Sequence, residues 1–335
     1  MIINLGYFLD SGASYVRVQA PAKVNLFLEI LGKREDGYHE LETLMCPISL
    51  CDSLLVENAD DGEITIDLDL PTTAVFRKNI ADGDDPAWNI PSGPENLVFR
   101  AAERLRSILD VKAGARISLT KQTPASAGLG GGSSNAAAAL VACCHLWSGW
   151  NRAAVTQVAN EIGSDIAFFL GDTNSIGLAL GTGRGEKCEQ IAAQPKLSFL
   201  LTHPPSGCST KDIYQGYQPT SHIRQSEKIV ATCKTGQYQM IGAEMFNALQ
   251  SSASKTTPWI DRQLDLMRSF GYEYVLMSGS GSSCFALQST SGSPDEDDER
   301  IKEFQRVANE QGIGRIFQVD AWFAPSIEHQ LASRQ

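Results

Sequence analysis

The chain has 335 residues, which is enough for a large buried core and predicts two domains, or one large domain with a lobe. Hydrophobic residues make up 42% and charged residues 20%, proportions that are ordinary for a soluble globular protein. The formal net charge of -11 argues against nucleic acid as the main partner, because nucleic-acid phosphates are bound by patches of Lys and Arg.

Export and membrane signals are missing from the sequence. No stretch approaches the ~20 apolar residues that cross a bilayer, and residues 1–14 lack the basic flank and apolar core of a secretory signal. The eight cysteines include no C-x-x-C pair and no zinc-like ligand set. Scattered cysteines are typical of reduced, intracellular chains, and Cys143 and Cys144 are expected to be small packing residues. We therefore expect a cytoplasmic protein with no membrane partner and no protein-built metal site.

The first part of the chain is rich in predicted strands. Alternating apolar residues predict strands over residues 15–30 (two strands around Pro21), 41–57 and 64–70. The segment 31–40 is a polar, charged turn. Residues 71–94 contain many prolines, aspartates and glycines without periodicity, which predicts a surface insertion or long loop.

A helix is expected next, over 95–109, followed by a strand over 115–124. A glycine-rich loop then runs directly into an alanine-rich segment. Because glycines disfavour helix interiors and alanines favour them, we expect a loop that leads into a helix, with Ser133 or Ser134 as its N-cap. A further helix is predicted over 152–162.

We place a domain boundary near residues 190–196, which divides the chain into 1–192 and 193–335. In the second part, strands are expected at 197–203 and on either side of a glycine turn within 272–287, and helical stretches at 225–250, 258–270 and 304–312. The segment 288–299 is predicted to be a polar, acidic loop.

The strongest chemical signal is the glycine-rich loop. Its residues are Pro124, Ala125, Ser126, Ala127, Gly128, Leu129, Gly130, Gly131, Gly132, Ser133 and Ser134. Glycines let the backbone approach a ligand closely, and the unpaired N–H groups and dipole at a helix N-terminus attract phosphate. The two serine hydroxyls can contact a phosphate or a magnesium-bound water. A merely flexible loop is the alternative, whereas the Walker pattern and a full dinucleotide fingerprint are absent.

Three weaker signals each have an ordinary structural explanation as well. Lys23 and Asn25 share one face of an apolar strand, although a lone lysine there often protects a sheet edge. Asp165 precedes an apolar segment, where an aspartate is commonly a helix N-cap. The sequence Ser-Gly-Ser-Gly-Ser-Ser at 278–283 fits a tight hairpin turn equally well.

Taken in order, A-P-A-K-x-N-L, G-L-G-G-G-S-S, G-S-D and S-G-S-G resemble the GHMP kinase superfamily over nearly the whole chain. The run R-E-D-G-Y-H-E-L-E-T-L at 34–44 is similar to the members that phosphorylate a cytidyl diphosphate-linked polyol of the non-mevalonate isoprenoid pathway. The resemblance implies an α+β fold of two domains. An N-terminal ATP-binding domain (1–192) and a C-terminal α/β domain (193–335) would form a cleft between them.

The resemblance also implies residue roles. Lys23 and Asp165 match the catalytic pair, and a lysine within ~4 Å would favour the charged form of the aspartate. The loop 124–134 matches the ATP site, and 278–283 the glycine motif that closes it. ATP is the implied phosphoryl donor and Mg2+ the implied ion at its phosphates, without a protein ligand for the metal.

The acceptor would be a small molecule that is held at the other end of the site. Asn25 matches a residue of the acceptor pocket, and Tyr38 and His39 match the cytosine-recognition element. Thr210 and Tyr214 match positions near the substrate, with Tyr214 as the second stacking ring. The oligomeric state stays open.

Some positions depart from the family pattern. Ala167 stands where a proline is usual, Ser126 replaces a Gly or Ala, 71–94 is long, and the segment 246–250 lacks two acids, so we assign it no role. Three alternatives remain: a homoserine, mevalonate or sugar kinase of the same superfamily, a non-catalytic nucleotide-binding sensor, and a dinucleotide oxidoreductase.

Overall fold

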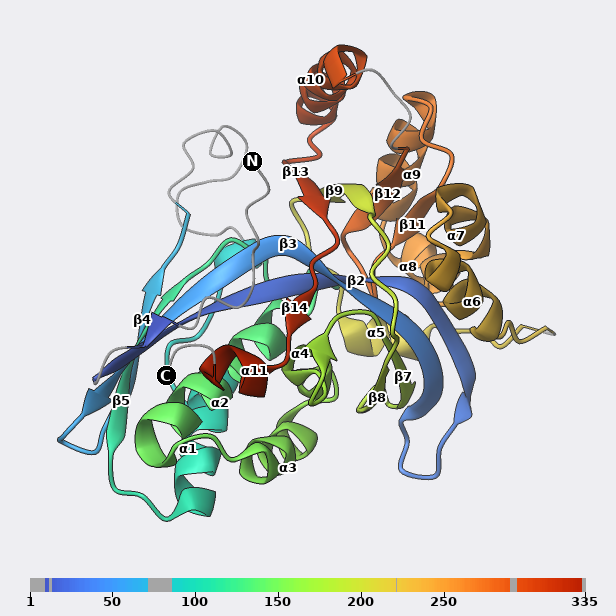
Figure 1. Cartoon of the computed structure of the whole chain (residues 1–335). Coiled ribbons are helices and arrows are strands. Elements are labelled where there is room, and N and C mark those ends of the chain that lie inside the picture. Colours follow the sequence, from blue (N-terminus) through green and yellow to red (C-terminus); the bar gives the residue numbers. More distant parts are fainter. Residues whose placement is uncertain (1–9, 12–13, 72–85, 221, 290–293, 333–335) are drawn as a thin grey trace.

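The structure is a computed structural model that describes residues 10–11, 14–71, 86–220, 222–289 and 294–332. Two long antiparallel strands, β2 (Tyr15–Lys33) and β3 (His39–Ala59), run through its centre (Figure 1). The two strands predicted around Pro21 are therefore one strand, with a register shift between Pro21 and Ala22. The predicted insertion 71–94 falls largely on residues outside the described part, and only a short 3-10 helix, η1 (Pro86–Trp88), is seen near its end.

The sheet around β2 and β3 holds most of the predicted strands of the first part. Its order is β1-β2-β3-β5-β4, with β7 beside β3 and β8 beside β7. The bounds are β1 (Asp10–Ser11), β4 (Ile64–Asp69), β5 (Gly114–Thr120), β7 (Ala179–Gly183) and β8 (Lys187–Gln190). The strand predicted to reach Pro124 ends at Thr120, and the chain that follows belongs to the glycine-rich loop.

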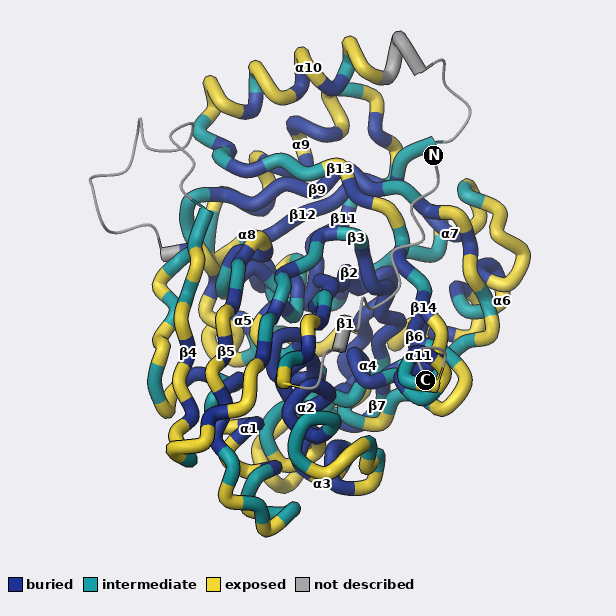
Figure 2. The backbone as a smooth tube through the Cα atoms, turned by 60° about the vertical axis from the view of Figure 1, so that its left-hand side comes forward, coloured by how far each residue is buried: buried dark blue, intermediate teal, exposed yellow. Residues whose placement is uncertain are grey.

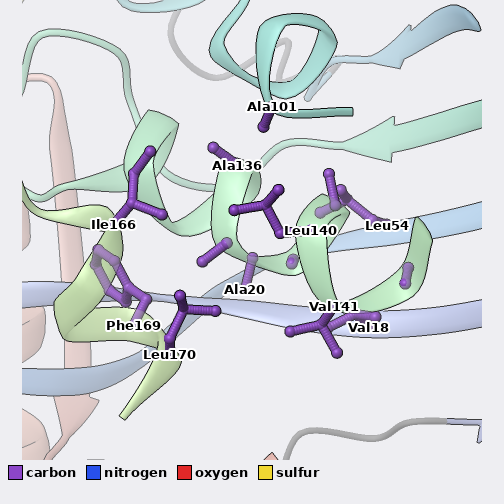
Figure 3. Close-up of a cluster of buried hydrophobic side chains, with 14 of the residues drawn as sticks. Val18, Ala20, Leu54, Ala101, Ala136, Leu140, Val141, Ile166, Phe169 and Leu170 are labelled. Atoms are coloured by element: carbon purple, nitrogen blue, oxygen red, sulfur yellow. The ribbon is translucent and has the colours of Figure 1, made fainter. Parts of the chain in front are cut away.

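Four helices lie together on one side of this sheet (Figure 1). They are α1 (Leu97–Leu109), α2 (Gly131–Ser148), α3 (Arg152–Ile162) and α4 (Ile166–Leu170). Alanine-rich α2 is buried along most of its length, so its small side chains let it lie close to the strands and to α1 and α4 (Figures 2 and 3). Cys143 and Cys144 are buried free thiols of this helix, as predicted.

The start of α2 differs from the prediction. The helix begins at Gly131 with Gly130 in the N-cap position, so neither Ser133 nor Ser134 caps it. A Cβ on Gly131 would approach Thr123 Cγ2 to 2.9 Å. Glycine is therefore required at this helical position by the neighbouring chain, and that packing outweighs its low helix propensity.

The second part of the chain forms an antiparallel sheet of order β11-β12-β9-β13, flanked by helices. The strands are β9 (Ser198–His203), β11 (Val275–Met277), β12 (Cys284–Gln288) and β13 (Arg315–Asp320). The helices are α5 (Thr210–Gln215), α6 (Glu227–Thr235), α7 (Tyr238–Glu244), α8 (Gln250–Thr256), α9 (Trp259–Ser269) and α10 (Pro294–Glu310). The acidic loop predicted at 288–299 was wrong from Pro294 onward, because that proline begins a helix.

Two short strands join the second part to the first. β10 (Phe246–Asn247) pairs in parallel with β2, and β14 (Ala324–Pro325) pairs with β6 (Ser175–Ile176). The last helix, α11 (Ile327–Ala332), adds Ile327 to the core beneath α2. The end of the chain thus returns to the first part, while the division at 192/193 stays a prediction. None of the helices described combines the length and apolar character needed to cross a membrane.

Candidate active site

A cavity of about 1650 Å3 is lined by residues from both parts of the chain. Its wall includes β2, the glycine-rich loop, the segment before α4, the start of α5 and the turn between β11 and β12. The predicted cleft is therefore present. The nominated catalytic, loop and acceptor residues all lie on its wall except Ser134, which is fully buried with a hydroxyl that has no partner among the described residues. Of the second glycine motif, 278–283, Gly279 and Ser280 line the cavity.

Lys23 lies on β2 at the floor of this cavity and is only 4% exposed. Its ammonium donates hydrogen bonds to Asn25 Oδ1 (2.7 Å) and to the carbonyl oxygen of Gly128 (2.9 Å). Its backbone N–H also donates to the carbonyl oxygen of Leu129 (2.9 Å). Lys23 therefore holds the glycine-rich loop against β2 and does not protect a sheet edge.

Asp165 stands in the N-cap position of α4, but its side chain makes no capping hydrogen bond. Its Oδ2 lies 3.9 Å from the ammonium nitrogen of Lys23, and its side chain is 33% exposed to the cavity and solvent. The capping explanation for this aspartate is therefore not supported. The carboxylate of Asp165 therefore faces the cavity beside the buried ammonium group of Lys23.

The electrostatics of Lys23 follow from this burial. Desolvation lowers the pKa of its ammonium group, and the nearby carboxylate of Asp165 opposes that shift. Asn25 completes the network, because its Nδ2 donates to Thr43 Oγ1 (2.8 Å), which in turn donates to the carbonyl oxygen of Phe27 (2.7 Å). Asn25, which accepts from the ammonium group of Lys23, is therefore held in place by its own hydrogen bond to Thr43.

The glycine-rich loop curves over the buried lysine. Gly128 and Gly130 have φ of 73° and 69°, in the left-handed region that glycine adopts readily. A Cβ on Gly130 would lie 3.1 Å from Lys23 Cγ, so the loop needs a glycine there to come this close. The loop leads directly into the N-terminus of α2, whose first N–H groups have no partner within the helix.

The second glycine motif closes over the first. The N–H of Ser283 donates to the carbonyl oxygen of Ala127 (3.1 Å), and Ser278 Oγ donates to that of Gly128 (2.9 Å). A Cβ on Gly279 would lie 3.2 Å from the ammonium nitrogen of Lys23. The hairpin explanation is correct for the backbone of this motif, yet the turn also forms part of the cavity wall beside the lysine.

Another part of the cavity wall is aromatic. Tyr38 is 57% exposed, and the guanidinium of Arg184 lies over its ring at 5.0 Å. His39 instead faces Tyr214, with ring centroids 5.4 Å apart. Partial burial, followed by the charge of Lys33, lowers the pKa of His39.

The remaining nominated residues line the same cavity. Asn25 is on the cavity wall beside Lys23, and Thr210 Oγ1 is hydrogen-bonded to Ser280 Oγ (2.9 Å) at the start of α5. Burial, followed by the charge of Asp165, raises the pKa of the Tyr214 hydroxyl. Tyr214 thus lies within electrostatic reach of the carboxylate.

Sequence reasoning missed the residues that support the second glycine motif. Asn247 Nδ2 donates to the carbonyl oxygens of Met277 and Gly279, both at 2.8 Å, and Gln250 Oε1 accepts from the N–H of Met277 (3.0 Å). This is the segment that received no role because two acids of the family pattern are absent. The amides were the available signal, since an amide can donate to and accept from backbone groups where a carboxylate can only accept.

No group of three or more His, Cys, Asp or Glu side chains in the described ranges is arranged to bind a metal ion. The described residues therefore do not form a cage of protein ligands for Mg2+. They are compatible with an Mg2+ ion that is bound mainly by water and substrate phosphates, which is the usual mode in phosphoryl-transfer sites.

Comparisons with known proteins agree with the architecture. The description "GHMP kinases N terminal domain" matches residues 96–172, and "GHMP kinases C terminal" matches residues 229–313. A protein from Listeria monocytogenes serotype 4a (strain HCC23), named 4-diphosphocytidyl-2-C-methyl-D-erythritol kinase, is 39% identical over 81% of this chain and 87% of its own length. A protein of the same name from Pelotomaculum thermopropionicum is 38% identical over 80% of this chain and 87% of its own.

Solved structures give the same result. The crystal structure of a 4-(cytidine 5'-diphospho)-2C-methyl-D-erythritol kinase matches with a TM-score of 0.67 and 30% identity, covering 91% of this chain and 98% of that one. A homoserine kinase from Cytophaga hutchinsonii also has a TM-score of 0.67, but at 19% identity it shows only that the fold is shared. The chain therefore belongs to the 4-diphosphocytidyl-2-C-methyl-D-erythritol kinase family of the GHMP kinases.

Proposed function

We propose that this protein transfers the terminal phosphoryl group of ATP to the 2-hydroxyl of 4-diphosphocytidyl-2-C-methyl-D-erythritol, a step in the non-mevalonate route to isoprenoid precursors. The observation that carries the proposal is the meeting of Lys23, Asp165 and both glycine motifs in one cavity whose other end is aromatic. Phosphoryl transfer depends on positioning and electrostatic stabilisation, and these groups supply both.

Lys23 and Asp165 form the proposed catalytic pair. The acceptor oxygen forms a bond to the terminal phosphorus, the bond from that phosphorus to the bridging oxygen of ADP breaks, and Asp165 takes the hydroxyl proton. Lys23 stabilises the charge of the transferring group and orients the carboxylate, from which it is separated by 3.9 Å. A weak base suffices, because the transition state of such transfers is loose.

The phosphates of ATP are assigned to the glycine-rich loop, residues 124–134. Its glycine backbone and the N-terminus of α2 present N–H groups to an anion without an added positive side chain. Ser133, on the cavity wall, is the hydroxyl placed to assist, whereas Ser134 is buried. Mg2+ would be held by the phosphates with help from Ser133, and would neutralise charge on them.

The cytidyl end of the acceptor is assigned to Tyr38, His39 and Tyr214. Stacking on an aromatic ring and hydrogen bonds to the base edge are the common way to bind a single pyrimidine. Asn25 and Thr210, nearer the lysine, would contact the erythritol part. Homoserine and mevalonate have no aromatic ring that could stack on these side chains, which favours the cytidyl compound over the acceptors of other GHMP kinases.

The direct test is a coupled assay of ADP release with ATP and a panel of acceptors that includes 4-diphosphocytidyl-2-C-methyl-D-erythritol, homoserine, mevalonate and galactose. We expect turnover with the cytidyl compound alone. Turnover with another acceptor and none with the cytidyl compound would overturn the assignment, and ATP binding without any turnover would favour the sensor. A cytoplasmic location and the lack of a nucleic-acid partner stay predictions.

A further inference from the structure

A buried carboxylate beneath the glycine-rich loop has no part in the function proposed so far. Asp52 is on β3, is completely buried and does not line the cavity. Its Oδ1 accepts hydrogen bonds from the backbone N–H groups of Gln122 (2.7 Å) and Thr123 (2.8 Å). Its Oδ2 accepts from the ammonium group of Lys121 and from Asn135 Nδ2 (2.8 Å).

These four hydrogen bonds join three separate pieces of the chain. Gln122 and Thr123 lie between the end of β5 and the start of the loop, and Asn135 is in the second turn of α2, after the loop. Lys121 also donates to Asn135 Oδ1 (2.9 Å), which closes the cluster. Asp52 therefore links both ends of the glycine-rich loop to the central strand β3.

The cluster lies directly behind the part of the loop that approaches the cavity. A Cβ on Gly131 would be 2.9 Å from Thr123 Cγ2 and 3.4 Å from the ammonium nitrogen of Lys121. The first residue of α2 thus rests on the groups that Asp52 fixes. Since four of the eleven loop residues are glycines and most of the others have small side chains, the shape of the loop must be imposed from such anchors.

The charge balance of the cluster supports the same role. Lys121 is only 3% exposed, and its ammonium group is paired with the carboxylate. A buried ion pair adds little to net stability compared with apolar packing, but the loss of one partner strands the other charge at high cost. A buried pair at this position is better explained by geometric specificity than by stability.

We propose that Asp52 is the positioning residue of the nucleotide-phosphate loop: it sets the separation of the two loop ends so that the backbone N–H groups converge on the phosphates of ATP. The inference rests on the proposed function, because it takes the loop to be the ATP site. It adds a residue that does not line the cavity itself and acts through the loop and through its partners Lys121 and Asn135, which do line it.

The test measures the Kd of a non-hydrolysable ATP analogue by calorimetry for the wild-type chain, Asp52→Asn and Asp52→Glu. Asp52→Asn turns an acceptor into a donor that faces Lys121 and Asn135. Asp52→Glu keeps the negative charge but moves the carboxylate by one methylene. We expect Kd to rise about tenfold for Asp52→Asn and roughly threefold for Asp52→Glu, with a change of less than about twofold in the Kd of CDP, which probes the acceptor end.

Glu328→Gln is the matched control. Glu328 on α11 accepts from Arg152 and Trp150 in another ion-paired cluster, outside the cavity wall. A purely structural role for Asp52 predicts that its variants resemble this control, with lower thermal stability and unchanged ATP-analogue affinity. Amide hydrogen exchange over residues 122–131 gives a second measure, and we expect it to be faster in both Asp52 variants but unchanged in Glu328→Gln.

The possible outcomes separate the two proposals. If the wild-type chain binds neither the ATP analogue nor CDP, the proposed function fails. If the wild type binds both and the folded Asp52 variants bind the ATP analogue equally well, the positioning role alone is wrong. If Asp52→Asn does not fold, Asp52→Glu decides the matter, because it retains the charge that pairs with Lys121.

Discussion

The two ends of the cavity are built in different ways. At the phosphate end, which is the part that we assign to ATP, the carbonyl oxygen of Gly128 is held by the side chains of Lys23 and Ser278. Buried Asp52 holds the N–H of Thr123, next to the loop. At the acceptor end, the wall consists of side chains such as Tyr38 and Arg184, which contact each other and solvent. The proposed function thus assigns the phosphates of ATP to the part held by buried hydrogen bonds, and the cytidyl acceptor to the part formed by partly exposed side chains.

Asp165→Asn is expected to reduce activity more than any other variant, without weakening ligand binding at either end of the cavity. Asparagine keeps the shape of the side chain but cannot take the hydroxyl proton, so kcat should fall by about 10²- to 10⁴-fold. The Kd values for the ATP analogue and CDP should change by less than about twofold. Steady-state kinetics and calorimetry together check this, and unchanged kcat would support the sensor.

Tyr38→Ala should affect the acceptor end alone. Loss of a stacking ring costs roughly 1–3 kcal/mol, so the KM for the cytidyl acceptor should rise about tenfold or more. The KM for ATP should stay within about twofold of the wild-type value, because Tyr38 contacts Arg184 and is not part of the glycine-rich loop to which ATP is assigned. An equal rise in both KM values would show that the two ends are not separate, and no rise in either would contradict the cytidyl assignment.

Glu328 is not on the cavity wall, so Glu328→Gln should alter the stability of the fold and leave ligand binding unchanged. Burial acts to raise the pKa of Glu328, but hydrogen bonds from Arg152 and Trp150 outweigh it and lower the pKa to about 2. Because this pKa is lower in the folded state than the ordinary value of 4.5, the ionised carboxylate stabilises the fold at pH values above 4.5. This stabilisation is lost as the pH falls toward 2. The variant should be less stable by about 1 kcal/mol at neutral pH in urea unfolding, with a smaller difference near about pH 3.

Ser126→Gly should have the smallest effect, at the phosphate end. Ser126 has φ of 53°, a left-handed conformation that costs a non-glycine residue up to about 1–2 kcal/mol. Glycine removes this strain but adds unfolded-state entropy, so we expect a net gain in folding stability of less than about 1 kcal/mol and unchanged ATP affinity.

The converse change in the same loop is Gly128→Ala. The added Cβ would collide with the backbone of Ser278, so this variant should weaken ATP binding strongly, in contrast to Ser126→Gly.

The elements that could be predicted from the sequence are those marked by local patterns. Local patterns predicted α3, α1 and most strands, because apolar periodicity and turn residues are local signals. The loop 124–134 was also found from the sequence, because it is marked by a contiguous run of glycines, and its role in phosphate binding stays a prediction. The start of α2 at Gly131 was not, because the reason for a glycine there is Thr123 and Lys121 packing behind it.

Long-range partners were missed for a related reason. Asp52 is 83 residues from Asn135, and Asn247 is 32 residues from Gly279, so no local pattern links either pair. The contacts among the aromatic residues were not predicted either. The resemblance implies that Tyr38 and Tyr214 both stack on the acceptor, which stays a prediction, and the structure adds that Tyr214 faces His39 and that Arg184 lies over Tyr38.

The central claim is that Lys23 and Asp165 act as one unit on the transferring phosphoryl group. A double-mutant cycle of kcat/KM with Lys23→Met, Asp165→Asn and the combined variant tests it most directly. If the two side chains serve one step, the combined variant should be no slower than about the slower single variant, because groups that act as a unit are non-additive. Two losses that multiply in full would show that the residues act independently and would contradict the account.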